Sequence, residues 1–133
     1  MIKETVTYVD YNDVERTEEY FFNLNDAEVL ELEMSTKGGL TALIDQATKA
    51  EDNPTIFRVL KEIIRKGYGV KSLDGKRFMK KKPDGTLYVD EFEDTEAYAV
   101  LFMKIVSDSG YFAKFINGMI SANAANKLAE RNR

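Results

Sequence analysis

Residues 92–120 read FEDTEAYAVLFMKIVSDSGYFAKFINGMI and hold six of the fifteen aromatic residues of the chain. Apolar residues recur in two runs at the spacing of one helix face, and residues 107–110 (SDSG) separate the runs. The first run is apolar on nearly all sides, which is typical of a helix that is wholly buried or that holds a partner on a second face. No side chain in either run is an obvious catalyst. The stretch therefore predicts two packed helices and favours protein association over chemistry.

These two helices supply the candidate partner-binding residues. They are large apolar side chains that repeat along the helices: Tyr98, Phe102, Met103, Phe112, Phe115 and Met119. Such residues form a core by default, but the apolar surface here exceeds what a core needs, and an exposed apolar patch marks an association site. The sequence leaves two interpretations open, a core alone or a core together with a partner surface.

Two strands are predicted at the N-terminus, over residues 2–9 and 14–23. Apolar and polar residues alternate along both, and Asp and Asn residues supply the turn between them. The apolar face carries the candidates for hairpin packing or for oligomerisation: Ile2, Val6, Tyr8 and Phe22. Two strands alone leave two open edges, so either the rest of the chain covers them or another subunit pairs with them.

Three helices are predicted in the middle of the chain. Asn25 begins the first, because Glu28 lies three residues further on, as a capping box requires. Residues 38–39 (Gly-Gly) end it, and a second helical pattern runs over residues 40–47. Residues 53–54 (Asn-Pro) begin the third and clearest helix with an N-cap followed by proline.

Residues 70–90 lack the helical pattern of the preceding segment and are rich in residues that favour turns. A short hairpin is predicted near residues 70–79, and residues 83–85 (Pro-Asp-Gly) supply a second turn. Further on, residues 117–118 (Asn-Gly) are predicted to end the last helix, with Met119 folding back.

The predicted fold class is α+β. An N-terminal antiparallel β-hairpin is followed by a bundle of about five α-helices, with a short turn-rich insert near residues 70–90. A chain of 133 residues is one domain by size. We assign residues 1–120 to that domain and residues 121–133 (SANAANKLAERNR) to a weakly structured C-terminal tail, in which only Leu128 is a sizeable apolar side chain.

Composition excludes several kinds of chemistry. The chain has no cysteine and no histidine, which excludes Ser-His-Asp and Cys-His catalysis and the usual zinc sites. The acidic residues between positions 90 and 96 lack the spacing of a calcium loop and are typical of a solvated helix N-terminus. We therefore predict no enzyme, no catalytic residue, no metal and no cofactor. No apolar run reaches the roughly 20 residues that span a bilayer, so we expect a cytosolic protein with no membrane partner.

A basic segment, residues 71–82, offers an alternative function. It carries six lysine or arginine residues with Phe78 among them, and such a segment can bind phosphates while the ring stacks on a base. The alternative is a small nucleic-acid-binding regulator, although the net charge of −4 argues against it. The ordinary interpretation of the segment is a solvated loop or a docking patch for acidic segments of the same chain. A carboxylate-dependent enzyme ranks third, because no spacing of acids suggests one.

Several stretches of the chain together resemble a known family. In order they are Asp10-Tyr11-Asn12, Val14-Glu15-Arg16-Thr17-Glu18, Tyr68-Gly69-Val70-Lys71-Ser72, Asp74-Gly75, Arg77-Phe78, Thr95-Glu96-Ala97-Tyr98, Leu101-Phe102-Met103 and Phe115-Ile116-Asn117-Gly118. In this order and spacing they are similar to the tail assembly chaperones of long-tailed, siphovirus-type bacteriophages and prophages of Gram-positive bacteria. The resemblance covers most of residues 1–120, and its motifs are structural rather than catalytic. Residues 80–89 depart from the pattern, because they are more basic and carry a Pro-Asp-Gly turn.

The resemblance implies a non-enzymatic role in the assembly of a phage tail. Such chaperones coat the long tape measure protein, keep it soluble and help to recruit tail tube (major tail) subunits. The partners implied are the tape measure protein, the tail tube protein and further copies of the chain itself. The place of action implied is the cytoplasm of the infected or lysogenic bacterial host, and the chaperone is absent from the mature virion.

Overall fold

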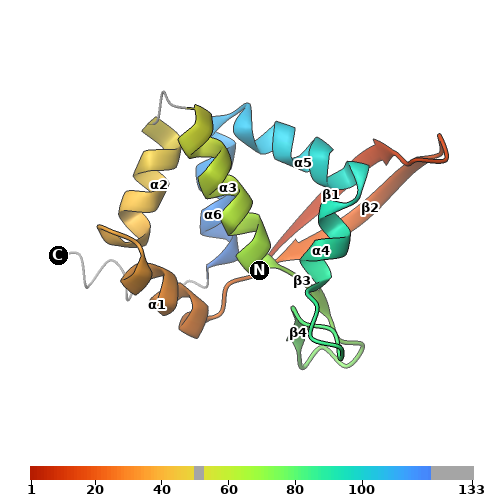
Figure 1. The fold of residues 1–133 in the computed structure, drawn as a ribbon, viewed down its shortest axis with the longest axis horizontal. Coiled ribbons are helices and arrows are strands. Elements are labelled where there is room, and N and C mark those ends of the chain that lie inside the picture. The colour runs from red at the N-terminus through yellow and green to blue at the C-terminus, as the bar shows by residue number, and fades with distance from the viewer. Residues whose placement is uncertain (50–52, 121–133) are drawn as a thin grey trace.

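Four strands and six helices make up the described part of the chain, residues 1–49 and 53–120 of this computed structural model (Figure 1). In chain order they are β1 (Ile2–Val9), β2 (Glu15–Phe22), α1 (Asp26–Ser35), α2 (Gly39–Lys49), α3 (Asn53–Gly67), β3 (Tyr68–Lys71), β4 (Phe78–Met79), α4 (Tyr88–Glu93), α5 (Glu96–Val106) and α6 (Ser109–Met119). The α+β class and the N-terminal antiparallel hairpin are confirmed. The sequence predicts about five helices, and the additional one is α4, a short helix within the turn-rich insert. The predicted tail lies outside the described residues.

The strands form one antiparallel sheet in the order β1-β2-β3-β4. β1 and β2 pair along their whole length, from Ile2 opposite Phe22 to Val9 opposite Glu15. β3 pairs with the end of β2 through two residue pairs, and β4 then pairs with β3. The predicted hairpin near residues 70–79 is thus an extension of the N-terminal sheet. Among the described residues, the outer edge of β1 pairs with no other strand.

The turn between β1 and β2 is held by one carboxylate. Asp10 accepts hydrogen bonds from the backbone N–H groups of Asn12 and Val14, and it pairs with the guanidinium of Arg16 at 2.5 Å. The hydrogen bond from Arg16 contributes most to holding the pKa of Asp10 below its usual value. Asp13 takes a left-handed conformation with φ of 61°, which aspartate tolerates better than most residues. The turn residues predicted from sequence therefore act as expected.

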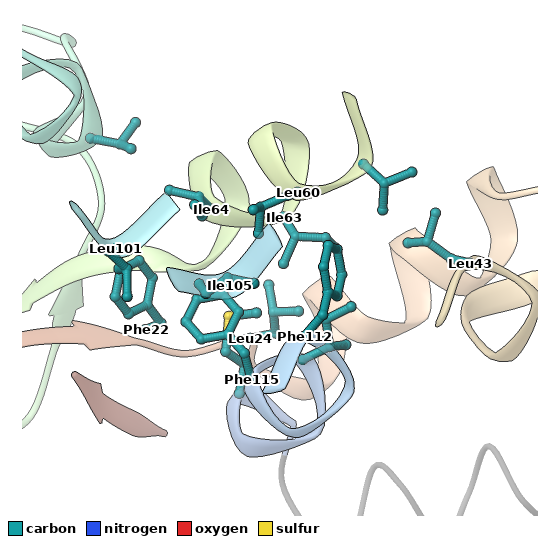
Figure 2. Packing of buried hydrophobic residues seen from close by; sticks show 14 of the residues in the cluster. Phe22, Leu24, Leu43, Leu60, Ile63, Ile64, Leu101, Ile105, Phe112 and Phe115 are labelled. Atoms are coloured by element: carbon teal, nitrogen blue, oxygen red, sulfur yellow. The ribbon is translucent and has the colours of Figure 1, made fainter. Parts of the chain in front are cut away.

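A hydrophobic core lies between the sheet and the helices. Its largest fully buried side chains include Phe22, Leu60, Ile63, Ile64, Leu101, Ile105, Phe112 and Phe115, which come from β2, α3, α5 and α6. Figure 2 shows these side chains gathered between their elements. The rings of Phe22 and Phe115 lie 5.1 Å apart, edge to face, which is a favourable aromatic arrangement. On α3 the apolar side chains Val59, Leu60, Ile63 and Ile64 are buried.

The end of α6 differs from the prediction. Asn117 and Gly118 do not end the helix, which continues to Met119 and is followed by Ile120 in an extended conformation. Gly118 has a packing role instead, because a Cβ there would lie 2.6 Å from Cδ1 of Ile2. The absence of a side chain therefore lets β1 approach α6 closely, which costs some helix propensity.

A buried carboxylate joins α1 to α2. α1 begins with the predicted capping box of Asn25 and Glu28. At its other end, the buried carboxylate of Glu33 accepts a hydrogen bond of 2.6 Å from the backbone N–H of Leu40 in the first turn of α2. A negative charge at a helix N-terminus is favoured by the helix dipole. A Cβ at Gly39 would overlap the carboxylate of Glu33, so the glycine at the start of α2 makes room for this contact.

Candidate functional site

The acidic residues after position 89 hold α4 in place. Asp90 pairs with Arg65 of α3 at 3.0 Å, and Glu93 also pairs with Arg65. Glu91 pairs with Lys82. Within the described ranges 1–49 and 53–120, no group of three or more acidic side chains is placed to hold a metal ion. In the same part of the chain, no helix is long and apolar enough to cross a membrane.

The basic segment also makes contacts within the chain. The ammonium of Lys80 donates to the backbone oxygens of Asn23 and Lys66, at 2.8 and 2.6 Å, and to the carboxylate of Glu28. Phe78 is half-buried, and its ring lies where a Cβ of Gly69 would be. Lys80 therefore links the sheet, α1 and the end of α3. The aromatic ring predicted to stack on a base packs against Gly69 of β3.

An exposed apolar groove lies between α3 and α5. It has a volume of about 370 Å³, and we call it the α3–α5 groove. Its lining residues are Phe57, Arg58, Lys61, Tyr98, Ala99, Phe102 and Met103. Phe57 is 46% exposed and Met103 is 60% exposed, although both are large and apolar. An exposed apolar cluster of this kind on a small protein marks an interaction site.

Aromatic contacts give the groove its floor. The ring of Phe102 lies 5.8 Å from that of Phe57 and 5.7 Å from that of Tyr98. Tyr98 in turn packs edge to face on the buried Phe92 at 5.7 Å. Burial raises the pKa of the Tyr98 hydroxyl, with a smaller contribution from the charge of Glu93, so this hydroxyl is neutral at physiological pH. The floor is therefore an uncharged surface anchored on the core.

One rim of the groove is basic. Arg58 and Lys61 of α3 line it, and both also line a neighbouring depression of about 480 Å³ with Glu62, Arg65 and Lys66. Arg65 is held by its acidic partners on α4. Neither Arg58 nor Lys61 has an ion-pair partner among the described residues. The groove thus presents an apolar floor beside two cationic side chains.

The six predicted partner-binding residues separate into two groups. Tyr98, Phe102 and Met103 line the groove. The three on α6 lie in the core instead: Phe112, Phe115 and Met119, each at most 1% exposed. These three pack against the sheet and the other helices, so they are inaccessible to a partner in this fold. The sequence pattern missed Phe57, although this aromatic ring lies beside the apolar stripe of α3 and that position was the available signal.

The four residues predicted for hairpin packing or oligomerisation lie on the sheet face toward the helices. Val6 and Phe22 are buried in the core. Ile2 packs against Gly118, and Tyr8 is half-buried with its hydroxyl donating to Glu18 at 2.9 Å. Their side chains thus pack the hairpin onto the molecule.

An exposed apolar groove and an unpaired strand edge are both features of surfaces through which proteins associate. A family model described as phage tail assembly chaperone matches residues 1–132. The chain belongs to the phage tail assembly chaperone family. Comparisons with curated proteins and with solved structures gave no match. The family match confirms the resemblance to phage tail assembly chaperones.

Proposed function

We propose that this chaperone acts without catalysis, binds the tape measure protein and keeps it soluble, as a coat of self-associating copies. The proposal includes recruitment of tail tube subunits, action in the cytoplasm of the bacterial host and absence from the mature virion. Membership of the family supports the general role in tail assembly. The observation that supports binding of the tape measure protein is the α3–α5 groove. It is an exposed apolar surface that lies outside the buried hydrophobic core.

The groove fits an amphipathic helix. A helical partner lays its apolar face into a groove of this kind and uses anchors one turn apart. Phe57, Phe102 and Met103 offer the apolar contacts. Each large side chain that becomes fully buried contributes roughly 1.5–3 kcal/mol, so one groove alone binds weakly. Many copies along one long partner give avidity, while each copy remains easy to displace when the tail tube assembles.

The free edge of β1 supports self-association. β1 is eight residues long and, within the described residues, it pairs with β2 along one edge only. An unpaired strand edge is a template for strand addition by another chain. Copies that join by this edge would keep their α3–α5 grooves free, because the groove lies between two helices. This arrangement fits a coat that contacts itself through the sheet and its partner through the helices.

Co-expression with the tape measure protein of the same phage tests the proposal. We expect the chaperone to increase the soluble fraction of the tape measure protein and to co-purify with it. Phe102→Glu should abolish both effects, because it places a charge on the apolar floor. Met34→Glu is the matched control, since Met34 is an exposed apolar residue of α1 outside the groove. If wild-type chaperone neither solubilises nor binds the tape measure protein, the proposal is wrong.

A further inference from the structure

A second exposed apolar surface lies on α1. Leu30 is 52% exposed and Met34 is 70% exposed, although both side chains are large and apolar. They are four positions apart, so they are neighbours on one side of the helix. Together with three smaller or polar residues, Ala27, Glu31 and Ser35, they line a shallow depression of about 510 Å³. We call these five residues the α1 face.

The remainder of α1 is fixed within the fold. Its start carries a complete capping box, and Val29 and Leu32 on its other side are buried in the core. The helix is therefore complete without the α1 face. Leu30 and Met34 form an apolar ridge on the outside of a helix that the core already holds in place.

The α1 face and the α3–α5 groove are complementary in polarity and in charge. α1 has four acidic residues and no basic one, and the exposed Glu31 lies on the α1 face itself. The groove has an apolar floor, with the exposed Arg58 and Lys61 along its rim. An apolar ridge with an acid beside it thus matches an apolar groove with bases beside it, and such complementarity selects partners.

The two surfaces lie apart within one chain. Figure 1 shows α1 and α5 on opposite sides of α3, with α1 beside α2 and α5 beside the sheet. The α1 face of a chain therefore cannot reach the α3–α5 groove of the same chain in this fold. The complementary surfaces can meet only when they belong to different copies.

We propose that α1 of one copy docks into the α3–α5 groove of a second copy, with Leu30 and Met34 on the apolar floor and Glu31 beside the basic rim. A helix in a groove uses anchors one turn apart, which is the spacing of these two side chains. The contact joins two different surfaces, so it is heterologous and leads to a row or a ring of copies. With two large anchors it is weak and reversible.

The contact between copies needs only this chain, so it does not depend on the proposed function. One consequence does rest on that function, because the same groove then holds either α1 of another copy or a helix of the tape measure protein. α1 keeps the groove covered until that partner displaces it. It also shows the kind of helix that the groove accepts, with apolar residues one turn apart and an acid beside them.

Cross-linking between copies tests the contact, because the chain has no cysteine of its own. Ser35→Cys places a thiol on the α1 face, and Ala99→Cys places one in the α3–α5 groove. Both changes keep the large apolar side chains of the contact. We expect an equimolar mixture of the two full-length variants, treated with a short bismaleimide, to give mainly the mixed dimer that joins positions 35 and 99. A denaturing gel and peptide mapping by mass spectrometry identify this dimer.

The matched control is a mixture of Ser35→Cys with Leu73→Cys. Leu73 is fully exposed in the turn between β3 and β4 and lies outside the groove, so its thiol is at least as accessible to the reagent. This mixture should give several-fold less mixed dimer. Equal cross-linking of the two mixtures would overturn the proposal. A majority of dimers joined through position 35 of both copies would also overturn it, because the α1 faces would then pair with each other.

Charge reversal tests the position of Glu31 beside the basic rim. Lys61→Glu in the Ala99→Cys protein should lower the yield of mixed dimer several-fold, and Glu31→Lys in the Ser35→Cys protein should restore most of it. Lys76→Glu reverses an exposed charge outside the groove and should leave the yield unchanged. A yield that stays low when the two reversals at positions 31 and 61 are combined would overturn this placement of α1.

Addition of the tape measure protein of the same phage separates this inference from the proposed function. A tape measure protein that binds should lower the yield of mixed dimer, because both occupants need the groove. Binding with undiminished cross-linking would overturn the shared use of the groove. If the tape measure protein does not bind, the proposed function is wrong, whereas cross-linking of the chaperone alone still decides whether α1 docks into the groove of a second copy.

Discussion

The hydroxyl of Tyr111 on α6 donates a hydrogen bond of 2.5 Å to the carboxylate of Glu4 on β1. Glu4 is only 4% exposed. A charged group that loses water must recover its hydrogen bonds within the fold, and Tyr111 is the side-chain donor that the described residues supply to Glu4. The contact therefore holds the N-terminal strand on the last described helix, at positions 107 residues apart in the chain.

Loss of this hydroxyl should destabilise the protein. In Tyr111→Phe the buried carboxylate of Glu4 keeps its place but loses its donor, which should lower the free energy of unfolding by about 1–3 kcal/mol. Urea unfolding followed by circular dichroism measures the change. Tyr88→Phe is the control, because no hydrogen bond of the Tyr88 hydroxyl is found among the described residues. Equal stability of the wild type and Tyr111→Phe would show that water replaces the tyrosine hydroxyl.

Alkaline pH should destabilise the protein through two half-buried tyrosines, Tyr20 and Tyr111. Burial raises the pKa of the Tyr20 and Tyr111 hydroxyls, and the hydrogen bonds with Tyr8 and Glu4, respectively, raise them further. A folded-state pKa above the unfolded value of ~10 means that the fold favours the neutral phenol. The stabilisation is thus complete below pH ~10 and is lost as the pH rises above that value.

Urea unfolding at pH 8 and at pH 11 checks this expectation. The wild type should lose stability between these two pH values, and Tyr20→Phe should lose less, because the phenylalanine cannot ionise. The comparison between the two proteins removes the contribution of lysine ion pairs, which also weaken in this range. Parallel pH profiles for the wild type and Tyr20→Phe would contradict the assignment to Tyr20.

Gly118→Ala should destabilise the protein although it improves helix propensity. Alanine is favoured over glycine within a helix by about 1 kcal/mol. Here its Cβ would lie 2.6 Å from Cδ1 and 3.1 Å from Cβ of Ile2, so the whole branched side chain of Ile2 must move. Overpacking of this kind costs about 1–3 kcal/mol, so we expect a net loss in the free energy of unfolding.

A double-variant cycle separates the two effects at Gly118. In an Ile2→Ala background the clash is absent, so Gly118→Ala should become neutral or stabilising. Urea unfolding of the four proteins gives the coupling energy between positions 2 and 118. If Gly118→Ala has the same effect in both backgrounds, Ile2 does not explain the glycine.

The same glycine shows what sequence patterns could and could not predict. Caps and periodic stripes are local signals, so the hairpin turn, the start of α1 at Asn25 and the buried stripe of α3 were predictable. Asn-Gly is also a local signal for a helix end, but at Gly118 a contact with β1 decides the structure. α4 was missed because a six-residue helix is too short to show a periodic stripe.

The candidate site was predictable only in part, for a similar reason. The apolar stripes of α5 and α6 look alike in the sequence, yet Phe102 borders the surface whereas Phe115 is buried. Which stripe lies inside depends on how the sheet and α3 pack around them, and no single helix encodes that. Phe57 completes the α3–α5 groove from a distant segment, so the groove exists only once α3 and α5 are brought together.

The basic rim of the α3–α5 groove should strengthen binding to the tape measure protein. Arg58 and Lys61 lie beside the apolar floor, so a partner helix with acidic residues next to its apolar face would fit best. The variant Arg58→Glu, Lys61→Glu should bind at least tenfold more weakly, which corresponds to about 1.4 kcal/mol. Binding by the wild type should also weaken as salt rises, because exposed charges are screened. Pull-down compares how much tape measure protein the variant and the wild type retain. Titration of the wild-type complex with salt measures the salt dependence of binding.

A charge-matched control distinguishes this rim from the basic turn of the β3–β4 hairpin. Lys76→Glu, Arg77→Glu changes the net charge by the same amount at two exposed residues outside the α3–α5 groove. If the rim matters, only the Arg58, Lys61 variant loses affinity for the tape measure protein. If both variants lose affinity equally, long-range attraction and not the rim explains the effect. Loss of nucleic-acid binding in the Lys76, Arg77 variant would instead support the alternative function of residues 71–82, and it would separate that function from the groove.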